Sequence, residues 1–261
     1  MQCCSAEILS NVEIAHNVYK LIIQKRNNEI WKPGNFLMVL PEPAPPFFSW
    51  KKAFSVYSQT EYQLEMVIKK VGRVTEILEK AKAGTQVSYL GPLGNSFNTN
   101  RIHDEETILV AGGIGIAPLH LLAQFFITQG IAFTLLYGAT TSSEIIKFSD
   151  LNSASSAIFY ATEDGSKGYK GKVTDVLSEY LAKSSRKKHI YACGPFAMLN
   201  ALHSHFNDPA LTIEVSIESV MACGFGVCRG CAIPVAGNAY KMACTDGPVF
   251  TLDEIIWEKW Q

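Results

Sequence analysis

The stretch Cys223-Gly-Phe-Gly-Val-Cys228-Arg-Gly-Cys231 decides how this chain is organised, and Cys244 completes it after twelve intervening residues. Written as a pattern, the cysteines read C-x4-C-x2-C-x12-C, a spacing by which four thiolates hold a [2Fe–2S] cluster. Glycines stand between the first three cysteines, and glycine accepts the positive φ angles of a loop that turns its N–H groups toward sulfur. The pattern therefore predicts a cluster bound by Cys223, Cys228, Cys231 and Cys244.

Zinc is the alternative metal for this loop. Most structural zinc sites use two C-x2-C pairs, and only Cys228 and Cys231 have that spacing here. Four unrelated buried cysteines would not explain why four of the seven cysteines fall within 22 residues. The spacing favours the iron–sulfur cluster, with zinc left open.

Bulk properties set the broad class of the protein. At 261 residues and 28.7 kDa the chain is long enough for two domains and a small third. The net charge of −1 gives no reason to expect nucleic acid as a partner. No apolar run is long enough to span a membrane. The N-terminus lacks the features of a signal peptide, and seven cysteines without an export signal suggest the cytoplasm. Cys3 and Cys4 are expected to be free thiols at a frayed end.

The first hundred residues predict an antiparallel barrel or sandwich. Short segments with alternating apolar residues, such as 18–24 and 63–69, are separated by turn formers such as Pro33-Gly34. The proline-rich stretch Pro41 to Pro46 is expected to be an exposed loop. The aromatic run Phe47-Phe48-Ser49-Trp50 either folds back into the core or offers a partner surface.

Three local patterns in this half bear on ligands. Lys52-Ala-Phe-Ser55 opens a strand, Gly72-Arg-Val-Thr75 precedes a helical run, and Gly91-Pro-Leu-Gly94-Asn95 closes the region. Thr75 can cap the helix, and a helix start after glycine is suited to a pyrophosphate. Each pattern alone is more typical of a plain turn, so only their order carries weight.

The middle of the chain predicts a nucleotide-binding α/β unit. The apolar strand 107–111 runs into a glycine turn and a helix with proline in its first turn, which together are typical of a phosphate site. The turn is not G-x-G-x-x-G, and a tight βα turn without a ligand is the alternative. The turn residues are Gly112, Gly113, Gly115, Ala117 and Pro118.

Further strands at 132–137, 157–161 and 189–193 alternate with helices at 173–181 and 196–206. This alternation predicts a parallel sheet with its ligand at the carboxyl ends of the strands. Cys193-Gly194-Pro195 lies at such an end, so Cys193 is expected to contact a nicotinamide, with inert packing as the alternative. No acid–base constellation is visible, and His203 and His205 lie on different helix faces.

Taken in order, a Lys-x-x-Ser strand, a Gly-Gly-x-Gly-x-Ala-Pro turn, a Cys-Gly-Pro strand end and a terminal four-cysteine loop resemble the ferredoxin–NADP reductase superfamily. Within it the chain is similar to the electron-transfer subunits of two-subunit, NAD-dependent dihydroorotate dehydrogenases. The closest agreement is Met221 to Cys231 with Cys244-Thr-Asp-Gly-Pro-Val-Phe250. The resemblance implies a multi-domain fold: an antiparallel FAD-binding β-barrel at 1–99, a parallel-sheet α/β NAD-binding domain at 100–214 and a [2Fe–2S] domain at 215–261.

The resemblance also implies the site residues. Ser55 would lie beside the flavin N5 atom and Cys193 beside the nicotinamide, as the two catalytic positions. Lys52 stands where the family has arginine and lacks its bidentate fork, so Lys51 is expected to share the diphosphate. The implied FAD residues are Lys52, Ala53, Phe54, Ser55, Gly72 and Thr75. The implied NAD(H) residues are Gly112, Gly113, Gly115, Ala117, Pro118, Cys193, Gly194 and Pro195.

The expected activity is an electron relay from NADH through FAD and the cluster to an FMN-containing catalytic subunit, in a heterotetramer. The segment from Ala139 to Glu144 carries no arginine for a 2′-phosphate, which favours NADH over NADPH. The surface around Cys223 to Cys231, together with the loop 47–50, is the expected interface. The alternatives are a reductase subunit linked to ferredoxin, sulfide or hydrogenase chemistry, and a zinc-stapled nucleotide-binding protein without turnover.

Overall fold

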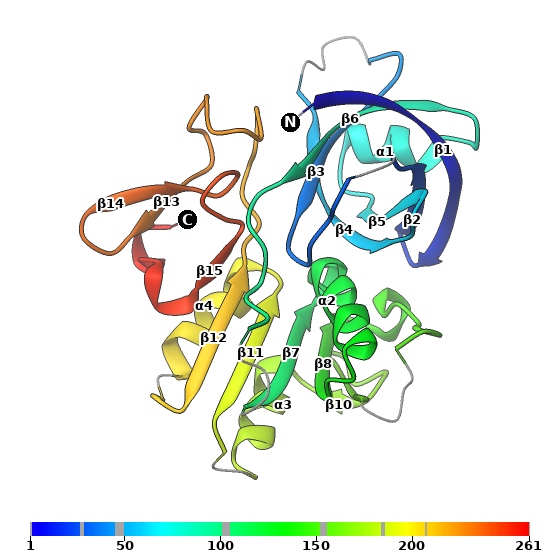
Figure 1. The fold of residues 1–261 in the computed structure, drawn as a ribbon. Coiled ribbons are helices and arrows are strands. Elements are labelled where there is room, and N and C mark those ends of the chain that lie inside the picture. The colour runs from blue at the N-terminus through cyan, green and yellow to red at the C-terminus, as the bar shows by residue number, and fades with distance from the viewer. Residues whose placement is uncertain are drawn as a thin grey trace.

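The computed structural model describes residues 2–26, 29–44, 50–100, 105–151, 156–183, 186–206 and 208–260. A barrel, a parallel sheet with helices on its faces and a small C-terminal unit lie side by side (Figure 1). The multi-domain fold expected from the sequence is confirmed. The longest described helix has 13 residues, and no described helix is long and apolar enough to cross a bilayer.

The N-terminal half is a closed antiparallel barrel with the strand order β1-β2-β5-β4-β3-β6. Alternation builds it: in β5, Leu64 and Met66 are fully buried whereas Gln63 and Glu65 are only half-buried. Helix α1 closes one end by burying Val74 and Leu78. The barrel elements are β1 (Gln2–Ala15), β2 (Val18–Gln24), β3 (Phe36–Pro41), β4 (Lys52–Gln59), β5 (Gln63–Lys69), α1 (Arg73–Lys80) and β6 (Gln86–Leu93).

Two expectations for this half were wrong. Cys3 and Cys4 do not lie at a frayed end, because β1 pairs with β6 from Gln2 onward and Cys4 is buried. Pro41 is the buried last residue of β3, so the expected exposed loop begins only at Glu42. Edge-to-edge closure of the barrel accounts for both, because it needs the whole length of β1 and β3. Residues 45–49, with most of the aromatic run, lie outside the described residues, and Trp50 is exposed.

The middle of the chain forms a seven-stranded sheet of order β10-β9-β8-β7-β11-β12-β15. All neighbours are parallel except β12 and β15. The chain leaves β7 toward β8 and later returns on its other side as β11, so the switch in strand order lies between β7 and β11. The elements are β7 (Glu106–Gly112), η1 (Gly113–Gly115), α2 (Ile116–Thr128), β8 (Phe133–Ala139), η2 (Ser142–Glu144), β9 (Ser156–Thr162), β10 (Tyr169–Lys170), α3 (Val173–Leu181), β11 (Lys188–Cys193), α4 (Phe196–His205) and β12 (Leu211–Ser216).

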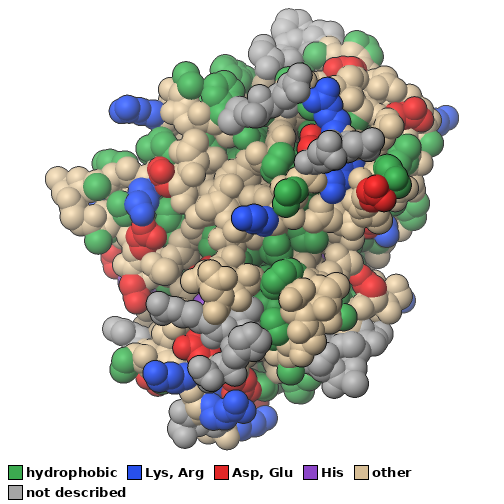
Figure 2. All heavy atoms as spheres, in the orientation of Figure 1, with side chains coloured by type: hydrophobic (Ala, Val, Ile, Leu, Met, Phe, Trp, Pro, Cys, Tyr) green, Lys and Arg blue, Asp and Glu red, His purple; other side chains and the backbone are tan. Residues whose placement is uncertain are grey.

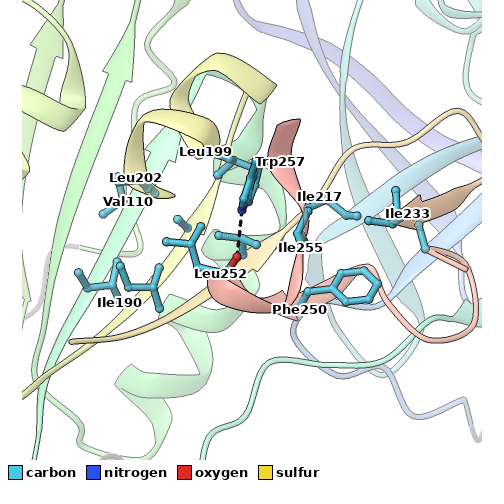
Figure 3. Packing of buried hydrophobic residues seen from close by; sticks show 14 of the residues in the cluster. Val110, Ile190, Leu199, Leu202, Ile217, Ile233, Phe250, Leu252, Ile255 and Trp257 are labelled. Carbon is cyan, nitrogen blue, oxygen red and sulfur yellow. Dashed lines mark hydrogen bonds between the residues drawn. The ribbon is translucent and has the colours of Figure 1, made fainter. Parts of the chain in front are cut away.

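The C-terminal unit is packed onto this sheet. Its strand β15 pairs with β12, and the expected boundary at 214 falls within β12. Trp257 is buried beside Leu199 and Leu252, and its indole Nε1 donates to the Leu252 carbonyl oxygen at 2.9 Å (Figure 3). The elements are β13 (Ala232–Val235), β14 (Ala239–Met242), β15 (Val249–Thr251), η3 (Leu252–Glu254) and η4 (Trp257–Lys259).

Asn95, at the end of the barrel, holds the C-terminal unit in place. Its side-chain amide donates to the carbonyl oxygens of Asp246 and Val249 at 2.9 and 2.7 Å, and its Oδ1 accepts the Val249 N–H at 2.9 Å. Its own N–H donates to the carbonyl oxygen of Gly247. The segment that closes the barrel is therefore also the clip that docks the loop after Cys244.

A buried charged group ties the connection between barrel and sheet to the sheet. His189 Nε2 lies 2.8 Å from Glu214 Oε1, and Glu214 Oε2 accepts the backbone N–H of Asn98 at 2.9 Å. The imidazole stacks on Tyr191 at 4.3 Å, and the Tyr191 hydroxyl donates to the Asn98 carbonyl oxygen. Every polar atom of Glu214 thus bonds to the sheet or to the connecting segment.

We expect Glu214→Ala to destabilise the protein by about 3 kcal/mol, because it leaves His189 and the Asn98 N–H buried without their acceptor. The melting temperature, followed by circular dichroism, should fall by on the order of 10 °C. The matched variant Glu65→Ala breaks the partly exposed Lys20 ion pair (3.5 Å) and should change stability by less than about 1 kcal/mol. Equal effects of the two variants would contradict this account of the buried group.

Candidate functional site

A cavity of about 350 Å³ lies where the barrel, the sheet and the C-terminal unit meet. It opens at the carboxyl ends of β7 and β11, on either side of the switch in strand order, where open α/β sheets bind their ligands. Its walls are mostly apolar with a few polar groups, as is usual for cofactor sites. The predicted residues that line it are Ala53, Phe54, Ser55, Thr75, Ala117, Pro118 and Cys193.

Strand β4 carries part of the barrel's contribution, beside residues of β3, β5 and α1. Ser55 pairs in register with Phe36 of β3, and both line the cavity. Lys52 is the exposed first residue of the strand and does not line the cavity. Lys51 donates from Nζ to Ser88 Oγ on β6. The lysine that was expected to share the diphosphate contact therefore already has a partner within the barrel.

The turn before α1 differs in one detail from expectation. Thr75 is not the N-cap of the helix but its third residue, and the N-cap is Gly72. The Thr75 hydroxyl accepts the N–H groups of Val71 and Gly72 at 3.0 Å each. Gly72 has an extended backbone that any residue adopts, and a Cβ there would meet no atom within 4 Å. Packing gives no reason for glycine at this position, and the open space above it suits a ligand.

The glycines of the two turns after β7 and β11 have different roles. A Cβ on Gly115 would lie 2.2 Å from the Cys193 carbonyl oxygen, and a Cβ on Gly112 would lie 2.7 Å from Met198 Sδ. Gly194 is closed in by the same methionine at 2.6 Å. These three glycines let the two turns pack together. Gly113, with φ of 54°, instead faces open space.

Cys193 lines the cavity and is buried. Burial raises the pKa of its thiol well above the ordinary value, and the nearby Glu218 raises it further. The thiol is therefore neutral at physiological pH. It can contact a ligand as a soft apolar wall, but it cannot act as a thiolate nucleophile.

Sequence reasoning missed the end of β12 and the segment that follows it. Ser216, Glu218, Ser219 and Met221 all line the cavity, and burial raises the pKa of Glu218. A signal was present, because Ser216 pairs in register with Cys193 on the neighbouring parallel strand. Polar residues after one strand lie beside those after the next, so Glu218 could have been placed at the same edge.

The cysteine loop turns backbone N–H groups toward sulfur. Gly226 donates to Cys244 Sγ at 3.1 Å, and Cys228 and Phe225 donate to Cys223 Sγ at 3.5 Å each. Positive φ angles at Gly224 (81°) and Gly226 (84°) make this turn. Burial opposes a charge on Cys223, yet these N–H bonds outweigh it and lower the pKa of the thiol to about 6. The loop thus stabilises the Cys223 thiolate. Burial and the adjacent Cys231 instead raise the pKa of the Cys244 thiol to about 12, against the Gly226 N–H that lowers it.

The four sulfur atoms fall into two pairs. Cys231 Sγ lies 3.3 Å from Cys244 Sγ, and Cys223 Sγ is hydrogen-bonded to Cys228, whose backbone N–H donates to it. Among the described residues, no three His, Cys, Asp or Glu side chains converge on a point where one metal ion would bind. Two irons of a [2Fe–2S] cluster share four thiolates. The four cysteines of this loop supply that number of sulfur donors.

Solved structures show the same architecture. A chain of an NADH-dependent reduced ferredoxin-NADP oxidoreductase, described for flavin-based electron bifurcation, is 30% identical, with a TM-score of 0.85 over 98% of this chain and 91% of that one. Phthalate dioxygenase reductase, at 17% identity and a TM-score of 0.66 over 90% of this chain and 87% of that one, shares the fold.

Family models match two segments. Residues 109–204 match the oxidoreductase NAD-binding domain, and residues 218–256 match the iron-sulfur cluster binding domain of dihydroorotate dehydrogenase B. The second match contains the four cysteines of the loop and the cavity residues Glu218, Ser219 and Met221.

Curated relatives extend the match to the whole chain. The dihydroorotate dehydrogenase B (NAD(+)) electron transfer subunit of Bacillus cereus (strain 03BB102) is 33% identical over 98% of this chain and 99% of its own length. The subunit of the same name from Bacillus mycoides (strain KBAB4) is 32% identical with the same coverage. This chain therefore belongs to the family of dihydroorotate dehydrogenase B electron transfer subunits.

Proposed function

We propose that this chain passes electrons between NAD(H) and a dihydroorotate dehydrogenase catalytic subunit through FAD and a [2Fe–2S] cluster. One observation carries the proposal: the cavity and the cysteine loop share a wall. Met221 lines the cavity two residues before Cys223. A Cβ on Gly224 would lie 2.6 Å from Met38, whose register partner Ala53 lines the cavity from the other side. A flavin in this cavity would be close to the cluster.

The barrel side of the cavity would hold FAD. Ser55 would face the reactive edge of the flavin, and Phe54 and Ala53 would pack on its apolar ring. The open space at Gly72 and the N–H groups at the start of α1 would take the diphosphate, with Lys52 supplying a point charge.

The sheet side would hold NAD(H). Gly113 gives the pyrophosphate room to approach the backbone, and Ala117 and Pro118 form the wall at the start of α2. The close packing among Gly112, Gly115 and Gly194 sets the position of Pro195 and of Cys193, whose neutral thiol would lie beside the nicotinamide.

When bound, FAD accepts a hydride from NADH and releases electrons singly, and the cluster carries them onward. The chain's own residues orient the two flat rings, keep water out with apolar walls and hold thiolates with N–H groups. Cys223, Cys228, Cys231 and Cys244 would be the cluster ligands.

The partner would dock on the exposed side of the cysteine loop. Val220 and Val227 are 84% and 74% exposed, Phe225 is exposed beside them, and Cys228 is the exposed member of the four cysteines. Figure 2 shows apolar side chains gathered over these loop tips. An apolar rim around the outermost ligand is typical of a protein interface. We infer an FMN-containing catalytic subunit in a heterotetramer.

All seven cysteines are free thiols, which supports a reducing compartment, and we place the complex in the cytoplasm. A second function has one observation in its favour. The sequence identity to a chain of the ferredoxin-NADP oxidoreductase, 30%, is nearly as high as the 33% identity to the curated relative from Bacillus cereus. In that case the chain would serve a ferredoxin-linked reductase rather than a dihydroorotate dehydrogenase.

The test begins with anaerobic reconstitution of the chain with FAD, iron and sulfide. Two irons and one flavin per chain are expected, and zinc without flavin would contradict the proposal. Addition of a dihydroorotate dehydrogenase B catalytic subunit should then couple dihydroorotate oxidation to NAD+ reduction. A reconstituted chain that binds its cofactors yet never couples to this partner would favour the second function.

Gly72→Ala should leave the stability of the cofactor-free chain unchanged, because its Cβ meets no atom and its backbone is extended. FAD affinity, measured by fluorescence quenching, should fall by about tenfold, since a methyl group would enter the space given to the diphosphate. Unchanged FAD affinity would remove Gly72 from the site.

Cys228→Ser should lower NADH-dependent orotate reduction by roughly 100-fold or more, because one cluster ligand is lost. NADH-dependent dye reduction should stay near the wild-type rate, since the cavity is untouched. The iron content and both rates are measured on one preparation. Loss of dye reduction with FAD retained would show that the cluster does not lie downstream of the flavin.

Val227→Asp should weaken binding of the catalytic subunit by about tenfold or more, because it places a charge in an apolar interface. Binding is measured by titration with reconstituted protein. Val12→Asp, on an exposed strand of the barrel at 53% exposure, serves as the control and should bind normally. Equal affinities for the two variants would rule out this face.

A further inference from the structure

An ion pair joins the barrel to the nucleotide-binding sheet beside the cavity. Lys69 is the last residue of β5, and its Nζ lies 3.2 Å from Oε2 of Glu144, the last residue of η2. The two side chains are 37% and 24% exposed, so water screens the pair and it is readily exchanged.

Lys69 lies where two hollows meet. It lines the main cavity together with Ser55 and Cys193, and it lines a small hollow together with Gly113 and Glu144. A dinucleotide with its nicotinamide at Cys193 and its pyrophosphate at Gly113 would therefore pass the Lys69 ammonium. The ion pair stands across that path.

Lys69 and Glu144 differ in how freely their side chains can move. The loop that carries Glu144 is braced, because His16 N–H donates to the Ser143 carbonyl oxygen at 2.9 Å and Ser142 N–H donates to Ser166 Oγ at 2.7 Å. Lys69 ends a strand and has a long flexible stem. When the pair separates, the lysine is the side chain that moves.

From this arrangement we infer that the Lys69–Glu144 ion pair is a latch that the dinucleotide displaces. Lys69 leaves Glu144 and binds the pyrophosphate, and Glu144 competes with the substrate for that ammonium. The inference rests on the placement of NAD(H) under the proposed function. It adds Lys69 as a residue that binds the pyrophosphate and Glu144 as a residue that opposes this binding.

Charge explains the direction of the exchange. A pyrophosphate linkage carries two negative charges and several acceptor oxygens, whereas Glu144 offers one charge, so the lysine gains by changing partner. The released carboxylate then lies near the bound phosphates and repels them. Glu144 thus weakens dinucleotide binding, and its removal should strengthen it.

The neighbouring residue provides a matched control. Lys70 forms an ion pair of nearly the same length with Glu79, at 3.3 Å, and lines neither of the two hollows. Substitutions in this second pair remove the same charges as those in the first. Lys70 is the residue next to Lys69 in the chain.

The experiment measures binding of ADP-ribose, which lacks the nicotinamide, to FAD-loaded protein by calorimetry at low and high salt. Lys69→Met should weaken binding by about tenfold, and Glu144→Gln should tighten it by about three- to fivefold. Both effects should shrink at high salt. In the Lys69→Met background, Glu144→Gln should have a smaller effect, because there is no ammonium left to release. Lys70→Met and Glu79→Gln should leave binding unchanged.

The outcomes separate the latch from the proposed function. Failure of the wild-type, FAD-loaded protein to bind ADP-ribose would overturn the nucleotide site itself. Binding that Lys69→Met leaves unchanged would overturn the latch alone. Weaker binding in Glu144→Gln would overturn it too, since Glu144 would then be a ribose ligand rather than a competitor. Because Lys69 also lines the main cavity, flavin content is measured for each variant, and Lys69→Arg, which keeps the charge, should bind almost as wild type.

Discussion

The contact of Gly115 with the Cys193–Gly194 peptide is the constraint on which the rest of the site depends. A Cβ at Gly115 would lie 2.2 Å from the carbonyl oxygen of Cys193, so only glycine lets these backbones come together. The contact brings the turn after β7 against the turn after β11, on either side of the switch in strand order. It thereby places the Cys193 thiol and the start of α2 on one wall. The contact allows no adjustment, because both of its sides are backbone.

Hydrogen bonds and a shared hydrophobic core hold the barrel and the C-terminal unit against this wall. Asn95 makes three side-chain bonds to the loop after Cys244, and one hydrophobic cluster contains Met38 of the barrel, Val110 of the sheet and both Cys231 and Cys244. Since the three parts share one core, the cysteine loop cannot shift without disturbing the barrel. Such rigidity suits electron transfer, which depends steeply on the separation of the cofactors.

Much of this arrangement could be predicted from the sequence, because short motifs carry their own geometry. The cysteine spacing, the turn after β7 and the helix at 173–181 depend on neighbours along the chain. The wall formed by Ser216, Glu218 and Met221 follows only once β12 is known to pair with β11, and the bonds of Asn95 join residues 154 positions apart. Neither arrangement is given by neighbours along the chain. Thr75 shows a third kind of limit. A threonine near a helix start bonds to the backbone in either of two positions, and only the structure distinguishes the cap from the third residue.

The glycines of the site differ in whether the fold requires them. A glycine motif is commonly interpreted as a phosphate loop, yet Gly112, Gly115 and Gly194 are explained by packing alone. Gly113 has a positive φ, which also favours glycine without any ligand. Gly72 is the exception, since neither crowding nor backbone conformation requires glycine there. Gly72, whose motif alone is more typical of a plain turn, is therefore the glycine whose identity points most directly to a ligand. A glycine that the fold does not require is stronger evidence for a bound ligand than a glycine that packing or backbone conformation requires.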